Sequence, residues 1–322
     1  MKPKLYPLQF EPILKERIWG GEKLKTVLNK PIVSKITGES WELSTVEGDV
    51  SVIANGTLKG KSLMDLIDET PSEILGTEVY KRFGKQFPLL FKYLDAREDL
   101  SIQVHPNDKL AKERHNSFGK TEMWYVLQAD TDARIIVGFK EDSSKEEYLE
   151  HLHNNTLVSI LDTVKAKVGD VFFLETGTVH AIGAGLVVAE IQQTSDITYR
   201  LYDFDRVDAN GNKRELHVDL ALDAINYNKV DTQKKYETKA DTSNVVVDCP
   251  YFTTNFIPLQ DKIEVSKSGA TFTVYMCIEG SFEIEYDGFK DVYQKGDTVL
   301  VPAEINAFFL SGNASILEIY IS

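Results

Sequence analysis

The segment Gly169-Asp-Val-Phe-Phe-Leu-Glu-Thr-Gly-Thr-Val-His180 decides the fold, because it has a second copy in Gly296-Asp-Thr-Val-Leu-Val-Pro-Ala-Glu-Ile-Asn-Ala307. In each copy a Gly-Asp pair comes one or two residues after a lysine and is followed by an apolar run. Gly-Asp is typical of a tight turn, and an apolar run between two turns is typical of a buried strand. The sequence therefore predicts two similar β-units in one chain.

A further strand precedes each copy, and here the two units differ. Glu122-Met-Trp-Tyr-Val-Leu-Gln-Ala129 corresponds to Thr273-Val-Tyr-Met-Cys-Ile-Glu-Gly280. The first unit has Glu122 and His180, two metal-ligating residue types, where the second has Thr273 and Ala307. Only the first unit is therefore expected to hold a metal ion.

The pattern Gly-Asp-x-x-x-x-Pro-x-Gly-x-x-His, after a strand that begins with glutamate, resembles the two motifs of the cupins. Cupins form small jelly-roll barrels. The resemblance implies a mainly β chain of two cupin-type barrels with a few inserted helices. Capping residues and apolar spacing predict these helices near residues 62–67, 71–76, 144–162 and 216–226.

The polar and charged segment 228–244 is interpreted as a linker. The expected domains are therefore a metal-binding catalytic cupin domain with helical insertions in 1–235, and a cupin-like β domain without metal ligands in 236–322.

Gln103 and His105 lie two residues apart on a probable strand, so both side chains point to one face. With Glu122 and His180 they offer two imidazoles, a carboxylate and an amide oxygen. This donor set suits a divalent cation, with Zn²⁺ as the first choice and one ion expected per chain. A lone histidine is more often hydrogen-bonded than ligating, and four others are interpreted in that way: His115, His151, His153 and His217.

The order of several motifs resembles that of the class I, cupin-type mannose-6-phosphate isomerases, particularly their short bacterial form. The motifs are Arg17-Ile-Trp-Gly-Gly21, Phe91-Lys92, Leu100-Ser-Ile-Gln-Val-His-Pro106, Lys120-Thr-Glu122, Gly177-Thr-Val-His180 and Ser195-Asp-Ile-Thr-Tyr-Arg200. Two departures are Thr121 in place of a common proline, and Glu175 where a proline is usual.

The resemblance implies zinc held by His105, Glu122 and His180, with Gln103 as a fourth ligand. It implies Arg200 as the catalytic arginine. It also suggests that the substrate pocket is lined by Lys92, Ser101 and Lys120.

The expected reaction interconverts mannose 6-phosphate and fructose 6-phosphate through an enediolate. Arg200 can stabilise the negative charge that develops. Glu190 and Lys120 are candidates for the proton-transferring base, because burial near a metal can tune either group towards neutrality. Two alternatives stay open: another metal-dependent cupin enzyme, such as an Fe(II) dioxygenase, and a non-catalytic regulator that binds sugar phosphates.

The composition and net charge limit the classes of molecule that the protein is expected to bind. The 322 residues carry a formal net charge of −14, which argues against nucleic acid. A hexose 6-phosphate substrate would need a local cluster of lysine and arginine. The two cysteines make no disulfide framework, and no apolar stretch approaches the length of a membrane span. A cytoplasmic location is expected, and the oligomeric state is left open.

Overall fold

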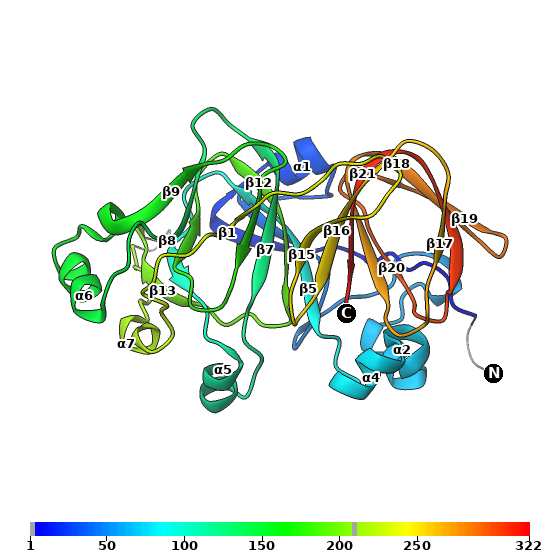
Figure 1. The fold of residues 1–322 in the computed structure, drawn as a ribbon, viewed down its shortest axis with the longest axis horizontal. Coiled ribbons are helices and arrows are strands. Elements are labelled where there is room, and N and C mark those ends of the chain that lie inside the picture. The colour runs from blue at the N-terminus through cyan, green and yellow to red at the C-terminus, as the bar shows by residue number, and fades with distance from the viewer. Residues whose placement is uncertain (1–3, 208–210) are drawn as a thin grey trace.

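In the computed structural model, which describes residues 4–207 and 211–322, two β-barrels lie side by side along the long axis (Figure 1). The first barrel contains a seven-stranded sheet, β1-β2-β5-β12-β7-β10-β14, and a five-stranded sheet, β13-β6-β11-β8-β9. Their strands are β1 (Ile13–Gly21), β2 (Thr37–Leu43), β5 (Leu89–Ala96), β6 (Ile102–Val104), β7 (Glu122–Ala129), β8 (Arg134–Phe139), β9 (Leu161–Lys165), β10 (Val171–Leu174), β11 (His180–Ile182), β12 (Leu186–Gln193), β13 (Tyr199–Tyr202) and β14 (Gln233–Lys234).

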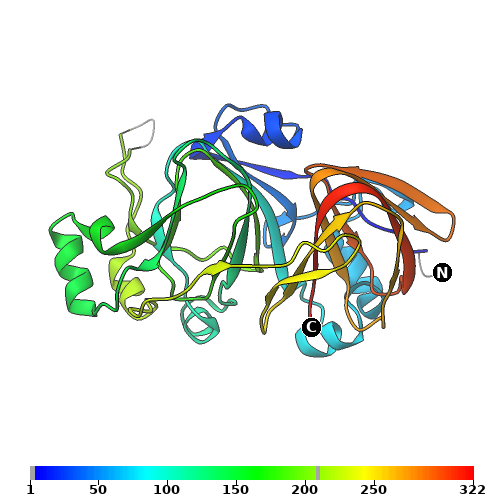
Figure 2. The same ribbon diagram turned by 45° about the horizontal axis from the view of Figure 1, so that its top comes forward.

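The second barrel is organised by two strands of 14 residues each, β18 (Thr273–Tyr286) and β21 (Ala307–Tyr320), which pair with each other. The first part of β18 pairs with β20 and its second part with β19, so the strand contributes to both sides of the barrel. In Figure 2 the strands of this half curve around a common interior. The remaining strands are β15 (Asn244–Asp248), β16 (Thr253–Leu259), β17 (Ile263–Ser266), β19 (Phe289–Gln294) and β20 (Thr298–Val301).

The sequence repeat is also a repeat of strand register. Glu122 pairs with Leu174 between β7 and β10. Thr273 pairs with Val301 in the same way between β18 and β20. The prediction of a mainly β chain with two related barrels is therefore confirmed.

The Gly-Asp turn is built identically in both barrels. The carboxylate of Asp170 accepts a hydrogen bond from the Lys167 backbone N–H at 2.8 Å, and that of Asp297 accepts one from Gln294 at 2.7 Å. The preceding glycines have φ of +88° and +94°, a region that favours glycine. The two copies of the sequence therefore form the same turn directly before β10 and β20.

Short helices lie between the strands: α1 (Lys23–Leu28), α2 (Leu63–Glu69), α3 (Pro71–Leu75), α4 (Thr77–Phe83), α5 (Asp108–His115), α6 (Lys145–His153) and α7 (Val218–Leu222), with a two-stranded β3 (Thr45–Val46) and β4 (Asp49–Val50) pair before α2. The Ser62 hydroxyl caps α2 by accepting from the Asp65 N–H at 3.0 Å, as the sequence predicts.

Two expected helices are wrong in length. The helix expected over 144–162 ends at His153, because Asn155 adopts a left-handed φ of +57°; a 3₁₀ turn (Leu157–Ile160) and strand β9 take up the rest. The helix expected over 216–226 is reduced to α7, and residues 216–217 and 223–226 lie outside the helix.

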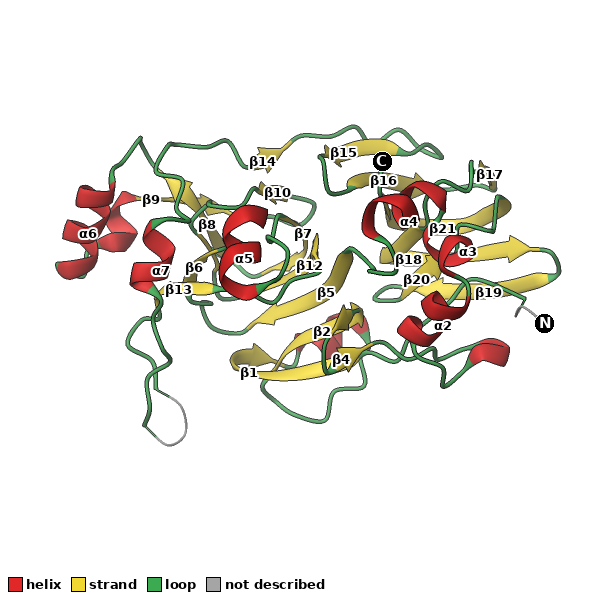
Figure 3. Cartoon of the chain, turned by 90° about the horizontal axis from the view of Figure 1, so that it is seen from below, coloured by secondary structure: helices red, strands yellow, loops and turns green. Residues whose placement is uncertain are grey.

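The two barrels share an apolar core. The rings of Tyr125 in β7 and Phe256 in β16 stack with centroids 6.2 Å apart. Helix α3 binds the second barrel through its backbone, since the carbonyl of Leu75 accepts from the Phe272 N–H at 3.0 Å. Figure 3 shows α2, α3 and α4 against this barrel. The core thus crosses the predicted boundary at 235/236, and the expected linker 228–244 adds β14 to the first barrel. That boundary stays a prediction.

None of the helices in the described part of the chain has both the length and the apolar composition needed to span a bilayer.

The repeated turn can be tested with a pair of alanine substitutions. A Cβ added at Gly296 would lie 2.5 Å from the backbone oxygen of Leu28, the last residue of α1, whereas one added at Gly288 (φ +78°) would meet nothing within 4 Å. Both variants carry the strain of a positive φ, about 1–3 kcal/mol. We expect Gly296→Ala to lower the urea midpoint clearly more than Gly288→Ala. Equal urea midpoints for the two variants would contradict this expectation, because they would mean that α1 moves away from the added Cβ without loss of stability.

Candidate metal centre and adjoining cavity

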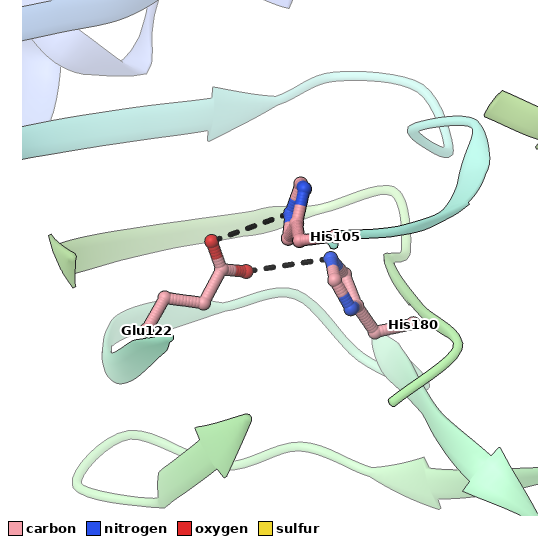
Figure 4. Close-up of side chains that lie close together, drawn as sticks. All are labelled: His105, Glu122 and His180. Atoms are coloured by element: carbon pink, nitrogen blue, oxygen red, sulfur yellow. Dashed lines mark ion pairs between the residues drawn. The ribbon is translucent and has the colours of Figure 1, made fainter. Parts of the chain in front are cut away.

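Three side chains from different strands converge inside the first barrel (Figure 4). His105 follows β6, Glu122 opens β7 and His180 opens β11. Each is at most 1% exposed. One ligand atom from each lies within 4.8 Å of the others, and the two imidazole Nε2 atoms are 3.5 and 3.3 Å from the carboxylate oxygens. The structure therefore brings together the three predicted metal ligands.

Backbone carbonyls fix the tautomers of both histidines. The Nδ1–H of His105 donates to the Ile197 carbonyl, and that of His180 to the Thr178 carbonyl, each at 2.8 Å. Burial holds the pKa of His105 well below its usual value and lowers the pKa of His180 to about 4. Both rings are therefore neutral at neutral pH, and both turn an Nε2 lone pair towards Glu122.

The negative charge of the Glu122 carboxylate is only partly compensated by the groups around it. Neither of its oxygens has a hydrogen-bond partner among the described residues, and it contacts the Lys120 ammonium only as an ion pair at 3.2 Å. Desolvation raises the pKa of Glu122 to about 7, although Lys120 opposes this shift. Two lone pairs and an unsatisfied carboxylate that face one another fit a divalent cation.

Gln103 lies beside this cluster. It pairs with His180 across β6 and β11, and its side-chain nitrogen is 3.2 Å from His180 Nε2. The two ends of an amide are assigned from their hydrogen bonds, so a flip of this side chain would present its oxygen to the same point. The role of Gln103 as a fourth ligand stays a prediction.

A cavity of about 520 Å³ opens next to the cluster. All the predicted substrate and acid–base residues line it together with Gln103: Lys92, Ser101, Lys120, Glu190 and Arg200. The structure thus brings together residues that lie up to 108 positions apart in the chain, the distance from Lys92 to Arg200. Their individual roles stay predictions.

The wall nearest the cluster carries alternating charges. Glu190 receives hydrogen bonds from the Lys92 ammonium at 3.0 Å and from the Trp124 indole at 2.9 Å. Burial alone would raise the pKa of Glu190, but Lys92 and Lys120 outweigh it and lower that pKa. Burial alone would lower the pKa of Lys120, but Glu122 and Glu190 outweigh it and raise that pKa. At neutral pH Glu190 is therefore ionised and Lys120 protonated.

Arg200 and Arg214 place two guanidinium groups on the same wall. Arg200 donates to the Glu215 carbonyl at 2.8 Å, while its buried Nε has no partner among the described residues. Arg214 grips Asp203 through Nε and Nη2. Burial, and after it the charge of Arg214, lowers the pKa of Arg200. An anion placed between the two would relieve this repulsion.

Several residues that line the cavity are not among the predicted site residues. Arg214 lies in a polar segment without strand or helix periodicity, so no local pattern singles it out. Arg17 and Trp19 belong to a motif of the resemblance, whereas Glu39 and Trp41 lie in β2, outside any of the quoted motifs. The motif itself was the signal that could have identified Arg17 and Trp19.

The second barrel keeps the polar framework of the first without its metal ligands. Lys92, Glu190 and Trp124 occupy paired positions on three adjacent strands of the first barrel. Asn255, Glu318 and Tyr275 occupy the corresponding positions of the second. Both Asn255 and Tyr275 donate to the Glu318 carboxylate at 2.9 Å.

Fold and site together define a two-barrel cupin protein with one buried His/Glu/His cluster beside a charged cavity. A family model for the phosphomannose isomerase type I catalytic domain matches residues 7–134, and a model for the mannose-6-phosphate isomerase cupin domain matches residues 241–321.

Similar proteins agree over nearly the whole chain. Mannose-6-phosphate isomerase ManA of Bacillus subtilis is 38% identical over 96% of both chains, and the mannose-6-phosphate isomerase of Streptococcus mutans is 35% identical over 97% of both. The crystal structure of the mannose 6-phosphate isomerase from Bacillus subtilis superimposes with a TM-score of 0.90 at 35% identity, covering 98% of this chain and 100% of the other.

The chain therefore belongs to the type I mannose-6-phosphate isomerase family, whose members are aldose–ketose isomerases. The prediction of this enzyme family is confirmed. Membership favours an isomerase over the two alternatives, a different metal-dependent cupin enzyme and a non-catalytic regulator.

The pKa values of the cluster predict how metal binding depends on pH. In the metal-free protein Glu122, with a pKa of about 7, is protonated below neutrality, while His180 takes up a proton only near pH 4. A cation must therefore displace one proton between pH 7 and 5. We expect Co²⁺ affinity, followed by its visible absorbance, to fall about tenfold per pH unit in that range and to level off above pH 8. An affinity that stays constant from pH 7 to 5 would contradict the raised pKa of Glu122.

Proposed function

We propose that this protein interconverts mannose 6-phosphate and fructose 6-phosphate, with one zinc ion bound per chain and in the cytoplasm. One observation carries the proposal: the unsatisfied Glu122 carboxylate and the two Nε2 lone pairs lie beside a cavity lined by Lys92, Lys120 and Arg200. Such a cavity offers a sugar phosphate both a cation site and fixed positive charges in an otherwise acidic protein.

The residues of the cluster suit zinc in particular. Two imidazoles and a carboxylate are a common donor set for catalytic Zn²⁺, which keeps a further position for water or substrate. When bound, the ion would polarise the oxygens of the substrate and favour the loss of a proton from the neighbouring carbon. His105, Glu122 and His180 would hold it, and Gln103 is the candidate for a fourth ligand.

Arg200 would stabilise the oxygen charge of the enediolate. It pairs with Gln103 across β13 and β6, so it stands on the strand next to the cluster. Its Nε has no partner within residues 4–207 and 211–322, which leaves a fixed donor for an anionic intermediate. Arg214 stands beyond it and is our candidate for holding the phosphate, with Ser101 on the same cavity wall.

Lys120 is the group that we assign to proton transfer, with Glu190 as the alternative. Both oxygens of Glu190 are occupied by Lys92 and Trp124, and its lowered pKa makes it a weak base. The Lys120 ammonium is held protonated mainly by Glu122 and Glu190. It would lose part of this stabilisation when Glu122 ligates a cation, so its pKa would fall towards the value that a base at neutral pH needs.

Metal removal tests the function directly. We expect chelator-treated protein to form no fructose 6-phosphate from mannose 6-phosphate in a coupled assay, and added Zn²⁺ to restore turnover. Glu122→Gln should lose metal and activity together, at least about 10²-fold. Glu175→Gln, at an exposed glutamate of the segment Gly169–His180, is the matched control and should keep both. Full turnover by metal-free protein would overturn the role of the ion.

Substitutions of Arg200 and Arg214 should have different effects on kcat and KM. Arg200→Ala removes a charge that acts on the intermediate and should lower kcat by about 10²–10³. Arg214→Gln removes a substrate contact and should raise KM, and its KM should depend less on salt. Arg134→Gln, whose partner Asp99 lies outside the cavity, is the control. Near-native kcat in Arg200→Ala would contradict its catalytic role.

A further inference from the structure

A second cavity, of about 700 Å³, is lined by the segment Thr194–Ile197, whose Asp196 also lines the catalytic cavity. The walls of the second cavity come from the β3 hairpin, from α2, from residues 115–118 at the C-terminal end of α5 and from this segment. Figure 3 views the molecule from the side on which α2, α4 and α5 lie. Its volume falls within the usual range of small-molecule sites, about 300–1,000 Å³.

The lining of this cavity is unsuited to a hexose 6-phosphate, the substrate proposed for the catalytic cavity. It contains the carboxylates of Glu47 and Asp196, and among the described residues that line it there is no lysine or arginine. A phosphate group would meet only negative charge and one imidazole, that of His115, which already contacts the Tyr199 hydroxyl at 2.8 Å. A ligand of this cavity therefore carries no phosphate.

The remaining groups suit a polyhydroxy compound. The half-buried ring of Phe118 offers an apolar face for C–H groups. Amides and hydroxyls of the lining, together with the two carboxylates, offer partners for O–H groups. The Thr194 hydroxyl at the wall is buried without a hydrogen-bond partner among the described residues, which leaves one polar group unsatisfied there.

The segment Thr194–Ile197 is bound to the metal centre. The Ile197 carbonyl accepts the Nδ1–H of His105 at 2.8 Å, and Asp196 lines both cavities. The Ser195 carbonyl is held from behind by the Gln192 side chain at 2.6 Å. A ligand that shifts this backbone would therefore turn the imidazole of His105, because that hydrogen bond sets its tautomer and orientation.

We propose that the second cavity binds an uncharged polyhydroxy compound, such as a free hexose or hexitol, and that its occupancy changes the metal affinity of the first barrel through the Ile197–His105 hydrogen bond. The coupling is reciprocal, so a bound metal changes the affinity for the sugar by the same factor. The site does not depend on the isomerase activity, since neither its lining nor the coupling uses turnover.

The test is calorimetric titration of the full chain with D-mannose and with D-glucitol, in the presence of saturating fructose 6-phosphate to fill the catalytic cavity. Ser117→Trp places a large side chain in the second cavity, and Ser117→Ala is the matched control; circular dichroism checks the fold of both. We expect one saturable site in the wild type and in Ser117→Ala, and at least about tenfold weaker binding in Ser117→Trp.

Phe118→Leu keeps an apolar side chain without the ring and should also weaken binding, so the site is tested even if Ser117→Trp does not fold. The coupling is read from Co²⁺ affinity with and without the sugar, where a change of about fivefold or more is expected. No saturable binding of either sugar, displacement by fructose 6-phosphate, or unchanged binding in both Ser117→Trp and Phe118→Leu would overturn the site. Equal Co²⁺ affinity with and without the sugar would overturn the coupling.

Discussion

The buried Glu122 carboxylate is the interaction on which the rest of the site depends. A carboxylate taken out of water is costly unless positive charge or several donors surround it. Among the described residues the ammonium of Lys120 is the charged group paired with it, and it faces two neutral imidazoles, whose lone pairs repel it further. The carbonyls of Thr178 and Ile197 enforce this arrangement, because they orient both rings. The barrel therefore holds a site that is incomplete without a cation.

Alternating charges extend from this carboxylate along the cavity wall. The ammonium of Lys120 lies between the carboxylates of Glu122 and Glu190. Lys92 pairs with Glu190 and also stabilises the carboxylate of Glu39, which forms an ion pair with Arg17. Each buried charge has a neighbour of opposite sign, which is what allows so many of them in one place. A change at Lys92 alters the pKa of all three neighbouring carboxylates, Glu122, Glu190 and Glu39, so these residues act as a unit.

The second barrel shows which parts of the framework persist where the ligand residues are replaced. Its Gly-Asp turn, strand register and central glutamate are kept, but Thr273 and Ala307 replace the ligands, and neutral Asn255 and Tyr275 replace Lys92 and Trp124 around Glu318. Its outer face packs on the first barrel through Phe256 and Tyr125. The repeat thus separates the requirements of the barrel from those of the site.

The sequence by itself determined the two similar β-units, the capped start of α2 and the ligand types of His105, Glu122 and His180, because strand alternation, Gly-Asp turns and capping residues are local signals. The two-barrel fold followed from the resemblance of these motifs to those of the cupins. Only the tertiary structure decided where helices end early, that the core crosses 235/236, and that Arg214 enters the catalytic cavity. These features depend on residues far apart in the chain. No local pattern records such contacts, because they arise only when separate strands and loops pack around a common interior.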